Sequence, residues 1–102
     1  MPNARFHLTL FGAVELLAPS GDVVTPRLRK SRALLAYLAL ADGRRIERAA
    51  LEQLLWADRA PRQARDSLKQ SLSDIRRAFG DASPCPLRTQ GGAVHLSMDR
   101  IT

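Results

Sequence analysis

The sequence predicts an α+β domain in which a small antiparallel sheet comes first, three helices follow and a β-hairpin comes last. Apolar residues near the N-terminus recur with the two-residue period of half-buried strands. Between residues 62 and 79 they recur instead with the 3.6-residue period of an amphipathic helix. Gly91-Gly92 separates two short stretches near the C-terminus, and such a pair favours a tight hairpin turn.

Length and charge limit the class of protein. The 102 residues suit one domain, which we place at residues 1–102. No apolar run approaches the roughly 20 residues that a membrane span needs, and the N-terminus does not resemble a signal peptide. We therefore expect a cytoplasmic protein with no membrane partner. The net charge of +6 and the pI near 11.0 fit a polyanion-binding protein, although many basic domains bind no nucleic acid.

The N-terminal strands are expected within residues 5–25. Residues 6–17 follow the strand period and are interrupted at Gly12, which predicts two strands. A turn at residues 19–22 then leads to a short third strand at residues 23–25. Three short strands so close together indicate a small antiparallel sheet.

Residues 26–80 are expected to form a three-helix core. The first helix contains the apolar segment 33–40 and ends at Asp42-Gly43, where Gly43 can adopt the left-handed cap conformation. After a connector or one-residue strand within residues 44–47, the second helix runs from Arg48 to Trp56, and Trp56 is expected to be a core or turn anchor. Its apolar face is predicted to contain Leu51, Leu54 and Leu55.

The third helix, from about Arg62 to Phe79, is the clearest amphipathic segment, and Pro61 suits its first turn. Its apolar side chains fall within one narrow arc, which we expect to pack on the other helices: Ala64, Leu68, Leu72, Ile75 and Phe79. The second and third helices, joined by a short break, match a helix-turn-helix. The hairpin expected within residues 86–98 matches a wing, so the predicted fold is a winged helix-turn-helix.

Three stretches resemble a known family. They are LTLFGAVEL at residues 8–16, KSRALLAYLAL at residues 30–40, and LEQLLW at residues 51–56 together with ARDSLKQSLSDIRRAFG at residues 64–80. Together they resemble the winged-helix DNA-binding domain of the Streptomyces antibiotic regulatory protein type, found in bacterial transcriptional activators. That domain is similar to the effector domains of OmpR/PhoB response regulators. The resemblance covers residues 6–97 and implies a transcription regulator.

The resemblance also sets expectations about partners. It implies double-stranded DNA and RNA polymerase subunits as partners, with binding either as a dimer or as tandem monomers on repeated sites. Members of the family usually continue into a helical-repeat domain, so we expect this chain to be a fragment of a longer regulator. The chain departs from the family at Glu47, where Ser or Thr usually caps the second helix, because glutamate is a poorer cap.

The polar arc of the third helix supplies the candidate base-reading residues. Side chains on the exposed face of a helix in the major groove can reach base edges. Gln70 can pair with an adenine edge, and Lys69 or Arg77 with a guanine edge. The candidate base-reading set is Asp66, Lys69, Gln70 and Ser73. A solvated charged face is the competing interpretation. Asp66 and Asp74 favour it, because each carboxylate repels phosphate locally.

Candidate phosphate-binding or flanking residues are mostly arginines in three places. On the third helix they are Arg62, Arg65, Arg76 and Arg77. On the wing, Arg88 and Thr89 precede the tight turn. At the first turns of the other helices they are Arg29, Lys30 and Arg48, because helix N-termini attract phosphate. The alternative for each of these side chains is plain solvation.

Catalytic and cofactor signals are missing from the sequence. Cys85 is the single cysteine, His7 and His95 have no partners at metal-ligand spacing, and no Gly-rich phosphate loop is present. We expect no enzymatic activity, no cofactor and no metal. A protein-interaction module is the alternative function. It would require an exposed apolar patch, and the outer arc of the third helix is polar throughout.

Overall fold

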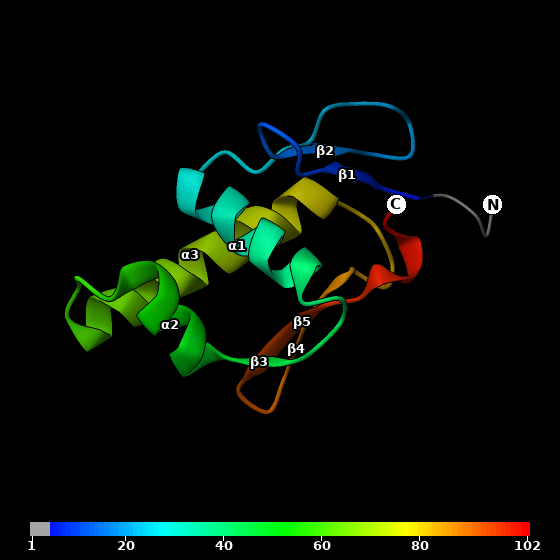
Figure 1. Cartoon of the computed structure of the whole chain (residues 1–102). Coiled ribbons are helices and arrows are strands. Elements are labelled where there is room, and N and C mark those ends of the chain that lie inside the picture. The colour runs from blue at the N-terminus through cyan, green and yellow to red at the C-terminus, as the bar shows by residue number, and fades with distance from the viewer. Residues whose placement is uncertain (1–4) are drawn as a thin grey trace.

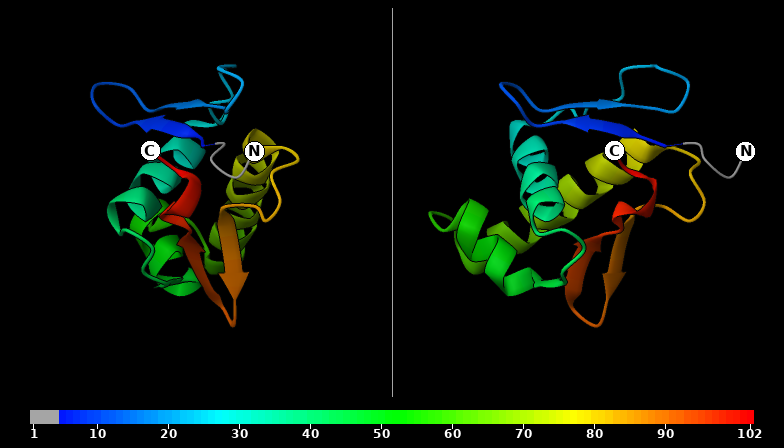
Figure 2. Two further views of the ribbon diagram at one scale, coloured as in Figure 1. Left: turned by 90° about the vertical axis from the view of Figure 1, so that its right-hand side faces the viewer. Right: turned by 45° about the vertical axis from the view of Figure 1, so that its right-hand side comes forward.

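The structure, a computed structural model, describes residues 5–102 and contains two small sheets and three α-helices (Figure 1). The elements, in chain order, are β1 (His7–Thr9), β2 (Glu15–Leu17), α1 (Arg29–Leu40), β3 (Ile46–Glu47), α2 (Arg48–Trp56), α3 (Pro61–Phe79), β4 (Leu87–Gln90), β5 (Ala93–Leu96) and a 3₁₀ turn at Met98–Arg100. The helices lie between the β1–β2 sheet and the C-terminal hairpin (Figure 2). This arrangement confirms the predicted α+β class.

The N-terminal sheet has two strands, and the predicted third strand at residues 23–25 is wrong. Val23 forms only an isolated bridge with Leu17. The Thr25 hydroxyl accepts the N–H of Leu16 at 3.0 Å, in the place where a backbone carbonyl would continue the ladder. Pro26 follows and has no N–H to donate. The ladder therefore stops after one residue.

The end of the chain returns to the N-terminal sheet, which the sequence did not indicate. Phe6 and Ile101 form a parallel bridge, and the N–H of Leu8 donates to the carbonyl of Thr102 at 3.0 Å. The C-terminus accordingly lies beside β1 (Figure 1). This pairing closes the molecule around the end of α3, where Phe6 meets Phe79 edge to face with ring centroids 4.8 Å apart.

Helix α1 ends as its sequence predicts. Ala41 is the C-cap, and Asp42 and Gly43 follow with φ angles of 53° and 86°. Two successive left-handed residues turn the chain sharply toward β3, and glycine is suited to this conformation because it has no Cβ.

Helix α2 has the predicted bounds, but its buried face is rotated from the predicted one. Leu51 and Trp56 are buried and Leu55 is half-buried, whereas the Leu54 side chain is 52% exposed. Trp56 lies about 140° around the helix from Leu51, on the side away from Leu54. Packing the indole turns the helix so that Leu54 faces solvent. Glu47 is the N-cap and makes no side-chain cap hydrogen bond, as expected.

The wing is an antiparallel hairpin with the predicted two-residue turn. Gly91 and Gly92 have φ angles of 57° and 83°, the left-handed values that such a turn requires. The connector before α2 adds the short strand β3, which pairs with β5 and gives the strand order β3-β5-β4. The wing, residues 87–96, is thereby fixed to the start of α2.

The core forms where α1 and α2 pack on the apolar face of α3. The five apolar residues predicted for this face are all buried: Ala64, Leu68, Leu72, Ile75 and Phe79. Leu34, Leu35 and Leu38 of α1 are fully buried against them in the same cluster. Within residues 5–102, no helix is long and apolar enough to cross a membrane.

Candidate nucleic-acid interface

The outer face of α3 carries an uninterrupted row of exposed polar side chains. The predicted base-reading residues all lie on it: Asp66, Lys69, Gln70 and Ser73. The predicted phosphate-binding residues of this helix are also exposed: Arg62, Arg65, Arg76 and Arg77. At 100° per residue, Arg65 and Arg76 border one side of the row, and Arg77 and Gln70 border the other. We call these eight residues the outer face of α3.

The wing borders the outer face on the side of Arg76. Strand β4 packs against α3, and Nη2 of Arg76 donates to the Thr89 hydroxyl at 3.2 Å. The structure therefore joins two residues that the sequence placed separately, one on a helix flank and one on the wing. Arg88 is exposed beside Thr89, on the same strand.

The segment that precedes α1 borders the outer face on the opposite side, and Asp74 holds it there. Asp74 Oδ2 accepts the N–H of Leu28 at 3.0 Å, and Oδ1 accepts the N–H of Arg27 at 3.4 Å. Leu28 is the N-cap of α1 and has no side-chain acceptor of its own. A carboxylate from α3 thus accepts two backbone N–H groups at the start of α1.

The sequence suggested that Asp74 belongs to the polar arc of the third helix and repels phosphate there, and the structure corrects this. The Asp74 residue is only 5% exposed, and the Arg77 guanidinium lies 3.8 Å from its carboxylate. Burial raises the pKa of this carboxyl, but the backbone hydrogen bonds from Leu28 and Arg27, the nearby Ser31 hydroxyl and the charge of Arg77 outweigh burial. The pKa of Asp74 is therefore lowered from its ordinary value. Its negative charge is thus partly offset within the fold by these donors and by Arg77.

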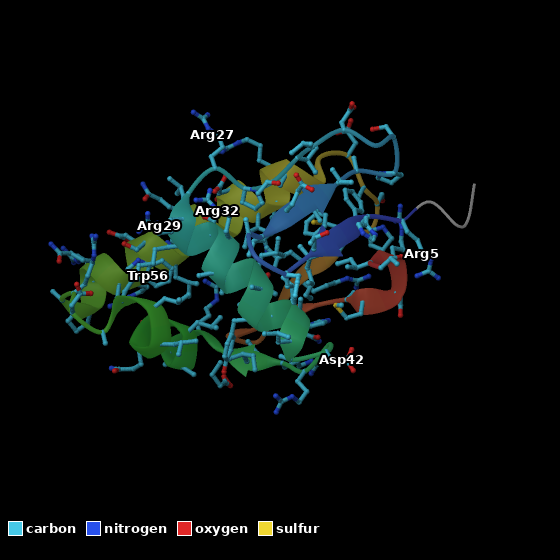
Figure 3. The ribbon with its side chains drawn as sticks, turned by 45° about the horizontal axis from the view of Figure 1, so that its top comes forward. Arg5, Arg27, Arg29, Arg32, Asp42 and Trp56 are labelled. Atoms are coloured by element: carbon cyan, nitrogen blue, oxygen red, sulfur yellow. The ribbon has the colours of Figure 1, made fainter. Side chains whose placement is uncertain are left out.

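An open cavity of about 590 Å³ lies between this segment and the outer face. Arg27 and Leu28 line it from the segment before α1, and the residues that line it from α3 are Lys69, Gln70, Ser73, Asp74 and Arg77. Arg27 extends away from the ribbon near the start of α1 (Figure 3). The cavity thus combines three cations with a single anion, and that anion is already hydrogen-bonded.

Lys30 has a partner inside the molecule. Its ammonium donates to the carbonyl of Leu55 and lies 6.0 Å from the ring centroid of Trp56. This side chain ties α1 to the C-terminal end of α2, so its charge is already in use within the fold. Arg29 is exposed one residue earlier (Figure 3).

Arg48 is half-buried at the start of α2. Its backbone N–H donates to the carbonyl of Gly92 at 2.9 Å, which joins the helix to the wing turn. Among residues 5–102, no three histidine, cysteine, aspartate or glutamate side chains are grouped so that they can hold a metal ion.

The interface also contains two contacts that sequence reasoning missed. Asp74 bonds to Leu28 across 46 residues of sequence, and Arg76 bonds to Thr89 across 13. No local pattern signals either contact, because each depends on how separate elements pack. In the sequence, the buried Asp74 has the same spacing along the third helix as an exposed polar residue has, so the helical period cannot distinguish the two.

Comparison with known proteins shows the fold. No protein-family model and no curated protein matches the sequence. The structure is similar to that of Mycobacterium tuberculosis EmbR, which was solved in complex with a low-affinity phosphopeptide. The TM-score is 0.73 and the sequence identity is 25%, over 97% of this chain and 27% of the EmbR chain. The chain thus spans about a quarter of the length of EmbR, and its α+β fold is of the winged-helix type.

Proposed function

We propose that this chain binds double-stranded DNA with sequence preference, as the DNA-binding domain of a bacterial transcription regulator. The observation that carries the proposal is the outer face of α3: it is exposed, polar and basic, and it lies between the wing and the segment before α1. The likeness to EmbR supports a regulator of this fold. A cytoplasmic location follows from DNA as the partner.

The shape of α3 suits the major groove. An α-helix with its side chains is about 10–12 Å across, and the major groove of B-DNA is about 12 Å wide. Helix α3 is the longest helix of the described residues, with 19 residues, and its outer face has no protein layer over it. The helix can therefore enter the groove while its apolar face stays in the core.

The candidate base-reading residues offer complementary chemistry to base edges. In the proposed complex, the Gln70 amide pairs with an adenine edge and the Lys69 ammonium donates to guanine acceptors. Ser73 can donate or accept, and the Asp66 carboxylate can accept from the cytosine amino group. All four side chains are exposed and make no hydrogen bond within the protein, as far as residues 5–102 are described.

The flanks of α3 supply the phosphate contacts in this proposal. Arg62 and Arg65 lie in the first two turns of α3, and Arg88 is exposed on strand β4 of the wing, where we propose that it contacts the flanking groove or backbone. Such contacts set the position and orientation of a protein on the duplex without reading its sequence. Arg29 and Arg48 are further candidates, and Lys30 would have to leave Leu55 to contribute.

The proposal extends to RNA polymerase subunits as partners and to binding as a dimer or as tandem monomers on repeated sites. These points rest on the family resemblance alone. A protein-interaction module remains the competing function. The exposed large apolar residues lie on other elements, and they are Phe11, Val23, Leu28, Tyr37, Leu40 and Leu54. Of these, Leu28 borders the cavity beside α3.

The decisive experiment is selection from a randomised duplex DNA library at two salt concentrations, followed by sequencing. We expect recovery of one motif and an affinity that falls steeply as salt rises, because neutralised phosphates release counterions. The matched controls are Gln70→Ala, which removes a base-reading side chain, and Arg5→Ala, which removes a charge from the N-terminal end of the molecule (Figure 3). Absence of any enriched motif with the parent chain would overturn the proposal.

A further inference from the structure

The cavity beside α3 has the charge of an anion site. Arg27, Lys69 and Arg77 contribute three positive charges and Asp74 one negative charge, which leaves an excess of two positive charges. The Asp74 carboxylate faces two backbone N–H groups and one guanidinium. These donors offset the repulsion between the carboxylate and an incoming anion. The Arg27 side chain is exposed, and the Arg77 side chain is 72% exposed despite its ion pair with Asp74, so both can reach an anion in the cavity.

The position of the cavity indicates which anion it receives. Gln70 and Ser73 line the cavity and also belong to the candidate base-reading set. When those residues face base edges, the cavity lies at the rim of the groove, where a DNA strand passes. Guanidinium groups match phosphate oxygens with their paired, planar N–H donors. A backbone phosphate therefore fits both the chemistry and the place.

Asp74 determines where both arginines stand. Its hydrogen bonds fix the backbone of Arg27 and Leu28 against α3, and its ion pair draws the Arg77 guanidinium to the same carboxylate from one helical turn away. Arg27 and Arg77 lie on separate elements, and Asp74 is the residue that contacts both. We propose that the cavity is the seat of a single DNA backbone phosphate, bound by Arg27 and Arg77, and that Asp74 is the positioning residue for both. This inference rests on the proposed function.

The number of phosphates is tested by the salt dependence of binding to the selected duplex. Each phosphate contact contributes about 0.9 to the slope of log affinity against log salt. Arg27→Ala and Arg77→Ala are each expected to weaken binding about tenfold. The double variant should lower the slope by about one unit in total, because both side chains serve one phosphate. A loss of about two units would show that they bind separate phosphates and would overturn the inference.

The position of the phosphate is tested by replacing single phosphates of the selected duplex with neutral methylphosphonates. At one position, the parent chain should lose affinity while the Arg27→Ala/Arg77→Ala variant loses none. At other contacted positions, both should lose affinity equally. If the double variant responds like the parent at every position, the inference fails. Arg5→Ala is the charge-matched control and should behave as the parent throughout.

The variant Asp74→Asn distinguishes a positioning role of Asp74 from simple charge repulsion, because the two predict opposite changes in DNA affinity. Removing a negative charge near DNA would by itself tighten binding. If Asp74 positions the arginines, Asp74→Asn instead weakens binding about tenfold and abolishes the effect of the one sensitive methylphosphonate, with the others unchanged. Tighter binding by this variant would overturn the positioning role. If the variant does not fold, the arginine variants still test the inference.

The proposed function and this inference fail in different ways. If the parent chain selects no DNA motif, the proposed function fails first. If the parent selects a motif and both arginine variants bind it as tightly as the parent, only the phosphate seat is excluded.

Discussion

The two faces of α3 are made by one continuous helix, yet they serve different ends. Leu68, Leu72 and Ile75 are no more than 2% exposed and pack in the core. Lys69 and Ser73, their immediate neighbours in sequence, face solvent. The residues that stabilise the fold and the residues proposed to bind DNA are therefore separated by about half a turn around the helix. Substitutions on one face should therefore change stability, and substitutions on the other should change only DNA binding.

The boundary between the two faces is less simple. Ser71 and Asp74 are polar but buried, and Asp74 contacts Arg27, Leu28 and Arg77 at the edge of the outer face. A buried carboxylate needs hydrogen-bond donors, and these donors come from the segment before α1. At this edge, therefore, one side chain takes part in both folding and the arrangement of the binding surface.

The largest expected effect belongs to the buried face. Leu72→Ala should lower the free energy of unfolding by about 2–5 kcal/mol, because it removes apolar contacts and leaves a cavity in the core. Chemical denaturation measures this loss. The matched control is Ser73→Ala, one residue along, which should stay within about 0.5 kcal/mol of the parent. Equal stabilities for the two variants would break the comparison.

The outer face should respond in the opposite manner. Lys69→Ala and Gln70→Ala should each cost about 1–3 kcal/mol of specific binding and relax the preference at one base pair, while unfolding is unchanged. Selection and sequencing with each variant measure the preference. A variant whose motif is identical to that of the parent would remove its residue from the base-reading set.

Arg76 tests the flank that faces the wing. Arg76→Ala should weaken binding to all sequences alike and lower the salt slope by about one unit, because a phosphate contact is lost. Thr89→Val removes the hydroxyl that accepts from Arg76 but removes no charge, so the slope should stay at the parent value. If Thr89→Val lowers the slope equally, Arg76 acts by holding the wing and not by binding phosphate.

The smallest expected effect is a change of stability with pH at the boundary. The pKa of Asp74 is lowered in the folded state from an ordinary value of 3.8, so its carboxylate stabilises the fold above that pH. The contribution is lost as pH falls from about 3.8 through the lower folded value. The difference in unfolding free energy between the parent and Asp74→Asn should shrink over that range. A difference that is constant with pH would indicate that charge plays no part.

Local patterns in the sequence were sufficient for most elements. The apolar period of α3 predicted the buried face, and Asp42-Gly43 and Gly91-Gly92 marked the end of α1 and the wing turn. The same logic failed at Leu54, which has the right spacing but lies 52% exposed. It also failed at the third strand, where the Thr25 hydroxyl took the place of a backbone partner.

The sequence by itself determined the order of the three helices and the wing, the residues at which the helices end and the polar character of the outer face of α3. These features depend on residues within a few positions of one another, and so periodicity and turn chemistry specify them. Only the tertiary structure decided what borders that face. The contacts Asp74–Leu28, Arg76–Thr89 and Phe6–Ile101 join elements far apart along the chain. They form because core packing brings unpaired donors and acceptors together, and no local pattern encodes that meeting.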